Sequence, residues 1–197
     1  MTNPFNLSIE FKPHEIDLED YQNYFKRKKI DFVEDSLINL LLTSTSRDET
    51  YYAVLSLREL GTEKSIPALK QVTLSKSNDV QATSVLTIGQ LANGSENEFL
   101  GQLLLNKNFR QKYYALWAIF VCLNNKAVES VKEFVIKSIK DINNISDSIP
   151  LALWYLDQYS EISGEIETKF AKVKDNIASL SPDIAAVLRN ETKYFCK

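Results

Sequence analysis

Glycine, proline and cysteine are scarce in this chain. Its 197 residues include five glycines, five prolines and two cysteines. A turn-rich all-β fold needs more glycine and proline, and few positions remain where a linker could divide the chain. Cys122 and Cys196 cannot build a disulfide framework and have no metal-ligand spacing. Cys122 lies in an apolar run, 117–123, and is expected to be a buried hydrophobic residue in a reducing compartment.

Long hydrophobic runs are also missing. No apolar stretch approaches the ~20 residues that a membrane span requires. Residues 1–5 lack the basic and apolar regions of a secretory signal. These absences predict a cytoplasmic protein without a membrane partner.

The chain has no excess of positive charge. It carries 23 Lys and Arg against 26 Asp and Glu, a net charge of -3. Nucleic-acid binding draws much of its affinity from phosphate neutralisation, so the net charge disfavours a nucleic-acid partner. The net charge does not exclude a local basic face that binds nucleic acid. The basic run 26–29 is a candidate for such a face, although a solvated helix end is the favoured interpretation.

His14 is the single histidine. A Ser-His-Asp or Cys-His site would have to use it, and nothing near it in the sequence suggests one. Ligands for a His/Cys metal site are lacking, and no glycine-rich phosphate loop is present. We therefore expect no catalytic residue, no cofactor and no metal, and a protein that is not an enzyme.

Amphipathic helical patterns fill most of the chain, separated by turns of two to six residues that make neighbours antiparallel. Ser46 to Glu49 and Ser95 to Glu98 read as capping boxes, and Gly61 as a left-handed helix stop. The expected helices span 13–29, 31–42, 48–60, 65–75, 79–91, 96–105, 109–123, 127–139, 147–157, 162–180 and a last one from Ser181.

The pattern repeats with a period of 31 residues. Asp48 falls on Asp79 and Leu60 on Leu91, and a further period leads to Cys122. The next step is about 37 residues, which takes Trp117 to Trp154. Each unit is a helix pair that cannot bury its apolar face alone, so neighbouring pairs must stack to form a core.

The segment 52–69 resembles a HEAT repeat of the short type first noted in phycobilin lyases. That type reads apolar-small-x-x-Leu-Gly, then a short turn and Ile-Pro-x-Leu. Here Leu60-Gly61 and Ile66-Pro67-Ala68-Leu69 match it. The likeness is close over 48–75, fair over 79–105 and loose over 109–140. Ala92 and Leu123 stand where the glycine should fall.

The resemblance implies an all-α fold, a right-handed α-solenoid (superhelix) of HEAT-like antiparallel helix pairs. We expect one domain. Residues 1–45 form an N-terminal arm and capping helices, 46–180 about four repeats, and 181–197 a C-terminal capping helix. The resemblance does not carry over the function of any one family member, because function depends on the site and not on the fold.

Two surfaces are candidates for binding. The stretch 141–168 contains acidic residues and no Lys or Arg, and its candidate contacts are Tyr155, Asp157, Tyr159, Glu161 and Glu165. The second candidate is the inner surface formed by the second helix of each pair, over 65–75, 96–105, 126–140 and 162–178. Its candidate residues include Lys70, Glu98, Gln102 and Glu133.

We therefore expect a non-catalytic protein-binding scaffold or inhibitor whose partner is a basic protein. One sharper hypothesis is a bacterial immunity protein that neutralises a basic toxin. The alternatives are a nucleic-acid-binding repair factor of the HEAT-like DNA glycosylase type, which would use Trp117, Trp154 and Asp157, and a bilin lyase-like chaperone. Core packing is the favoured role of both tryptophans. The oligomeric state stays open.

Overall fold

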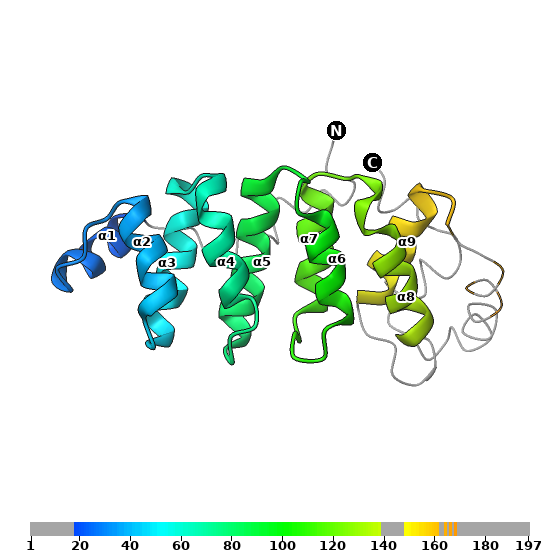
Figure 1. Cartoon of the computed structure of the whole chain (residues 1–197), viewed down its shortest axis with the longest axis horizontal. Helices are drawn as coiled ribbons and strands as arrows, with labels where there is room; N and C mark the ends of the chain where they lie inside the picture. The colour runs from blue at the N-terminus through cyan, green and yellow to red at the C-terminus, as the bar shows by residue number, and fades with distance from the viewer. Residues whose placement is uncertain (1–17, 139–147, 162–163, 165, 167, 169–197) are drawn as a thin grey trace.

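The computed structural model of the chain describes residues 18–138, 148–161, 164, 166 and 168 (Figure 1). Within these residues every regular element is helical, which confirms the prediction of an all-α fold. The expected arm before residue 13 and the expected helix from Ser181 lie outside the described residues. Of the expected helix 162–180, residues 164, 166 and 168 are described, and all three are helical. The helices are α1 (Leu18–Arg27), α2 (Glu34–Thr43), α3 (Arg47–Leu60), α4 (Ile66–Val72), α5 (Asn78–Ala92), α6 (Asn97–Leu105), α7 (Lys112–Val121), α8 (Val128–Ser138) and α9 (Ser148–Gln158). Short 3₁₀ turns, η1 (Glu63–Ser65) and η2 (Asn125–Ala127), precede α4 and α8.

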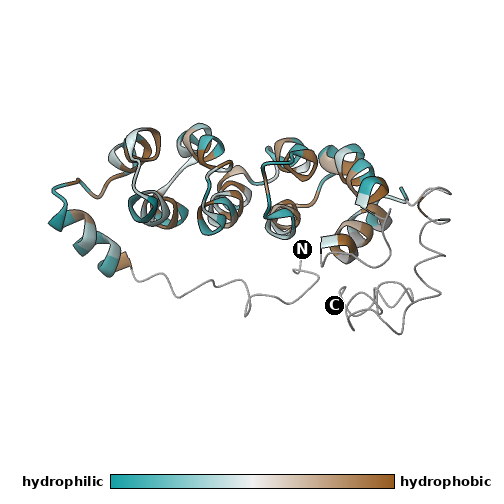
Figure 2. Cartoon of the chain, turned by 90° about the horizontal axis from the view of Figure 1, so that it is seen from below, coloured by the Kyte–Doolittle hydropathy of each residue, from teal (hydrophilic) through white to brown (hydrophobic). Residues whose placement is uncertain are grey.

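The helices from α2 to α9 lie in two rows, which are seen end-on in Figure 2. In the first row α3 packs on α5, α5 on α7 and α7 on α9; in the second row α2 packs on α4 and α6 on α8. The sequence pattern pairs the helix at 48–60 with the helix at 65–75. In the structure the closer contacts join α2 to α3, α4 to α5, α6 to α7 and α8 to α9, and η1 stands between α3 and α4.

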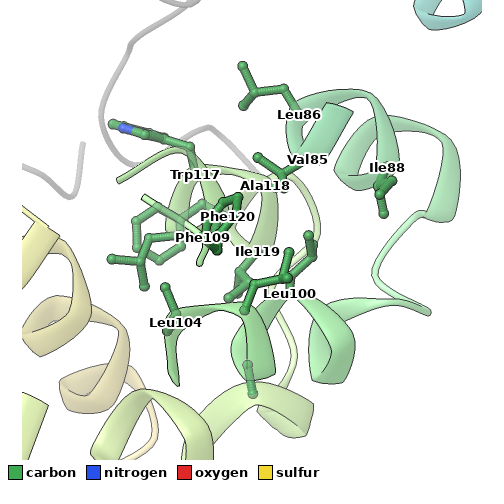
Figure 3. Close-up of a cluster of buried hydrophobic side chains, with 14 of the residues drawn as sticks. Val85, Leu86, Ile88, Leu100, Leu104, Phe109, Trp117, Ala118, Ile119 and Phe120 are labelled. Carbon is green, nitrogen blue, oxygen red and sulfur yellow. The ribbon is translucent and has the colours of Figure 1, made fainter. Parts of the chain in front are cut away.

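The core lies between the two rows. Its central part contains Val85 and Ile88 of α5, Leu100 of α6, and Ile119 of α7 (Figure 3). Gly89 brings α5 and α7 together, because a Cβ at this position would lie 2.7 Å from the carbonyl oxygen of Ala118. The two helices therefore pack closely in the middle of the array.

The turns along one edge of the array repeat every 31 residues. Ser44, Ser75 and Asn106 occupy equivalent positions, and each side-chain oxygen accepts a hydrogen bond from the backbone N–H two residues later, at 3.0, 3.2 and 2.9 Å. These serine and asparagine side chains close the same local turn three times. The sequence period thus corresponds to a repeated backbone geometry.

Helix starts follow the sequence only in part. Ser46 accepts a bond from the N–H of Glu49, as the capping box predicts, but Glu49 does not reach back and instead accepts from Ser44. The second predicted capping box is wrong, because α6 begins after Glu96 with no side-chain cap. Asn97 is buried there and donates to the carbonyl of Cys122 at 2.8 Å. A contact far along the chain therefore decides this helix start.

The predicted left-handed stop at Gly61 is also wrong, since its φ of -77° and ψ of 157° are extended values open to any residue. Glycine is needed there for space. A Cβ would lie 2.3 Å from the carbonyl oxygen of Leu57. The following turn is held by Glu34 of α2, whose carboxylate accepts bonds from Thr62 and Ser65.

Candidate protein-binding face

Tyr155, predicted as an exposed aromatic contact, is fully buried in α9. Its hydroxyl donates a hydrogen bond to the backbone carbonyl of Asn124 at 2.5 Å, and burial raises the pKa of the phenol above its usual range. Tyr155 holds α9 to the turn before α8 and has no surface to offer a partner.

The rest of the predicted acidic stretch is only partly described. Glu161 forms an ion pair with Lys132 of α8 at 2.9 Å, and this contact raises the pKa of Lys132. Tyr159 is half-buried, with its ring centroid 5.1 Å from that of Tyr155. Glu165 and the side chain of Asp157 lie outside the described residues. The ion pair of Glu161 therefore connects the end of this stretch to α8 in the second row of helices.

The second predicted surface is better defined. Glu98 and Gln102 are both exposed on α6 and lie four residues apart, so they form one stripe on that helix. On the neighbouring α8, Glu129 and Glu133 are exposed with the same spacing. We call the surface made by these four residues the α6–α8 face.

The two stripes point in the same direction. Gly101 of α6 packs against Ala127 and Ser130, where a Cβ would lie 3.0 to 3.1 Å from their Cβ atoms. Helical positions turn by about 100° per residue. The helices α6 and α8 run in the same direction. When they are viewed along their axes, both stripes lie on the same side of the line that joins the two helices. The four polar side chains therefore line one continuous surface.

Three carboxylates and one amide make the α6–α8 face acidic. Among the described residues, Lys137 forms an ion pair with Glu133 on the same helix, and Lys132, which pairs with Glu161, also interacts electrostatically with Glu129. Near the face, Lys70 of α4 pairs with Glu96 and lies 4.8 Å from the ring centroid of Phe99. Lys70 was expected on this surface but is engaged by those two residues. The face can attract a cationic surface, because its remaining charges have one sign.

Sequence reasoning missed Glu129, although its spacing of four from Glu133 was a usable signal. It also missed Lys112, which is half-buried at the start of α7 and donates to the carbonyls of Leu103 and Asn106 at 2.8 and 2.7 Å. Burial lowers the pKa of Lys112 to about 8. Its partners are the terminal carbonyls of α6, so it closes that helix end. No sequence signal distinguishes it from an exposed lysine.

The tryptophan that a glycosylase-like site would need is part of the core. Trp117 is 5% exposed, and its ring lies 5.6 Å from that of Phe120 in an edge-to-face arrangement (Figure 3). This agrees with its predicted packing role. The side chain of Trp154 lies outside the described residues.

No protein-family model, curated protein or solved structure matches the chain. Within the described ranges, no three or more His, Cys, Asp or Glu side chains gather where they could hold a metal ion. In the same part of the chain, no helix is both long enough and apolar enough to cross a membrane.

Proposed function

We propose that this chain is a non-catalytic protein-binding scaffold, a right-handed α-solenoid of HEAT-like helix pairs that takes a basic protein on its α6–α8 face. The observation that carries the proposal is the alignment of two glutamate stripes on adjacent second-row helices. The repeated turns and the two-row packing support a rigid array. A rigid surface loses less entropy on binding than a loop does.

Electrostatic complementarity would give this face its selectivity. Like-signed exposed carboxylates speed the encounter with a cationic surface and oppose acidic competitors. Gln102 between them can donate and accept hydrogen bonds without adding charge. A toxin-neutralising immunity protein is the sharper form of the proposal, and it requires the bound partner to be a basic toxin.

Charge reversal on the face tests the proposal. Glu98→Lys, Glu129→Lys and Glu133→Lys are combined in one variant. A control variant reverses Asp31, Glu59 and Glu63, which are exposed elsewhere and give the same change in net charge. Each full-length protein is immobilised, incubated with lysate of the source cells at physiological salt and analysed by mass spectrometry.

The expected result is a basic protein retained by the unmodified chain and by the control variant and lost from the face variant. Affinity of the recovered protein, measured by calorimetry with purified components, should fall at least tenfold for the face variant alone. Equal retention by both variants would refute a role of this face. Retention of acidic proteins only would refute the basic partner.

A further inference from the structure

Positive charges gather at the edge of the array that carries the 31-residue turns. This edge holds the turns between α2 and α3, α4 and α5, and α6 and α7, and lies at the bottom of Figure 1. We call its exposed cations the basic rim. They are Lys28, Arg47, Lys76, Lys107 and Arg110.

The basic rim is one connected structure. At one end, Lys28 pairs with Glu49 of α3 at 3.3 Å. Arg47 then crosses from the first turn to the second, where its guanidinium donates to Ser77 and pairs with Asp79. Gln81 links the second turn to the third. These contacts fix the relative positions of the turns that carry the cations.

Gln81 makes the last link with a buried side-chain amide that is 1% exposed. Its nitrogen donates to the carbonyls of Ser75 and Asn108 at 2.7 and 3.2 Å, and its oxygen accepts from the backbone N–H of Arg110 at 3.0 Å. The turn that presents Lys76 is therefore fixed to the turn that presents Lys107.

Among the residues that the structure describes, three carboxylates share the edge, and each has a cationic partner. Asp48 and Asp79 both pair with Arg47, and Glu49 pairs with Lys28. Among the described residues, no carboxylate lies within ion-pair distance of Lys76, Lys107 or Arg110. These three side chains are therefore available to an external anion.

A hollow of about 630 Å³ lies on the rim between the first two turns. Its lining combines Arg47 and Lys76 with hydroxyl groups of both turns, among them Ser44, Thr45 and Ser75, and with the apolar side chains of Leu41, Val72 and Leu74. Arginine, lysine and hydroxyl side chains are the groups that proteins most use to contact phosphate oxygens. The hollow gives a phosphate group a place between two turns.

We propose that the basic rim binds the sugar–phosphate backbone of a nucleic acid. Its turns present similar donors at each period, and packed helices lie about 8–10 Å apart. Three phosphate steps of one duplex strand advance by a similar length along the axis, about 10 Å. A regular polyanion matches this spacing, whereas the charges of an acidic protein have no fixed period. The contacts carry no base recognition, so binding does not depend on sequence.

Fluorescence anisotropy with a labelled 24-base-pair duplex and a 24-nucleotide single strand tests the proposal on the full chain. Three available cations predict a slope of log affinity against log salt of about -2.7 for the duplex, or a loss of about 40-fold between roughly 50 and 200 mM salt. Lys107→Glu should reduce the slope by about 1. The combined variant Lys76→Glu, Lys107→Glu, Arg110→Glu should abolish binding while its circular dichroism spectrum stays unchanged.

Lys126→Glu is the matched control, because Lys126 is also an exposed turn lysine but lies beyond the opposite end of α7. It should leave the slope unchanged. No binding of either probe at 50 mM salt would overturn the proposal, as would an equal effect of the rim and control variants. Displacement by poly-glutamate at equal charge concentration would overturn it in favour of an acidic protein. Binding of the duplex or of the strand supports it and identifies the form preferred.

Discussion

Replacing Gln81 with leucine should show how strongly neighbouring turns are held together. Leucine has a similar volume but no polar group, so the change removes an amide from a buried site without opening a large cavity. The carbonyls of Ser75 and Asn108 and the N–H of Arg110 would each lose a partner. Buried backbone groups that lose their hydrogen bonds are costly.

The expected cost follows from the bond lengths. The bond to Ser75, at 2.7 Å, is short, the bond to Arg110, at 3.0 Å, is of typical length, and the bond to Asn108, at 3.2 Å, is at the long end of the normal range. At about 1–1.5 kcal/mol for each bond lost, the free energy of unfolding should fall by about 3 kcal/mol. With a urea dependence of about 2 kcal/mol per molar, the urea midpoint should fall by about 1.5 M.

Urea titration followed by circular dichroism measures this change. Gln71→Leu is the matched control, because Gln71 is exposed on α4 and its replacement should change stability by less than about 0.5 kcal/mol. Amide hydrogen exchange of Arg110 should also speed up in the Gln81 variant. If the two glutamine variants have the same midpoint, the amide does not hold the turns together and the reasoning fails.

Three further predictions concern packing and pH. Gly89→Ala should destabilise the fold by about 1–3 kcal/mol in thermal unfolding, because the added methyl group meets the backbone of α7. Gly164→Ala is the control and should not destabilise it, because no heavy atom lies within 4 Å of the added Cβ. Equal melting temperatures of the two variants would contradict the close packing of α5 on α7. Burial lowers the pKa of Lys112 from 10.5 to about 8 in the folded chain. Between these two values the unfolded chain binds more protons than the folded chain, so the free energy of unfolding should rise with pH. Lys112→Met should lose this rise when urea midpoints at pH 7.5 and 9.5 are compared. Burial acts to raise the pKa of Glu34, but hydrogen bonds from the turn 62–65 bring it below the usual 4.5. The ionised carboxylate therefore stabilises the fold, and this contribution is lost as pH falls below 4.5. Glu34→Gln should therefore flatten the acid limb of the stability curve, and an unchanged limb would exclude this contribution.

Local patterns were enough to predict the described helices, because an amphipathic period of 3.6 residues depends on residues close together in the chain. Their lengths were predicted less well, since α4 and α7 are shorter than the predicted 65–75 and 109–123. The 31-residue period was also visible in the sequence and recurs in the turns at Ser44, Ser75 and Asn106. Helix ends were less predictable. The cap at Ser46 depends on neighbours three residues away, whereas the start of α6 depends on Asn97 reaching Cys122.

The candidate face shows the same division. Glu98 and Gln102 could be placed on one helix stripe from their spacing, but only packing at Gly101 shows that Glu129 and Glu133 share their surface. Tyr155 looked like a surface aromatic because acidic residues surround it in sequence. Its burial depends on where α9 settles against the turn at 124–127, which its own neighbours in the chain do not specify.

The sequence by itself determined the all-helical class and the repeat, since both depend on residues close together in the chain. It also determined a net charge of -3, which disfavours a nucleic-acid partner when taken as a total. Only the tertiary structure decided where those charges lie. Alternating helix directions bring every second turn to the same edge, so Arg47, Lys76 and Lys107 become neighbours, and ion pairing neutralises the carboxylates among them. Net charge is a sum over the whole chain, whereas a ligand interacts with the charges on one surface, and packing determines which charges share that surface.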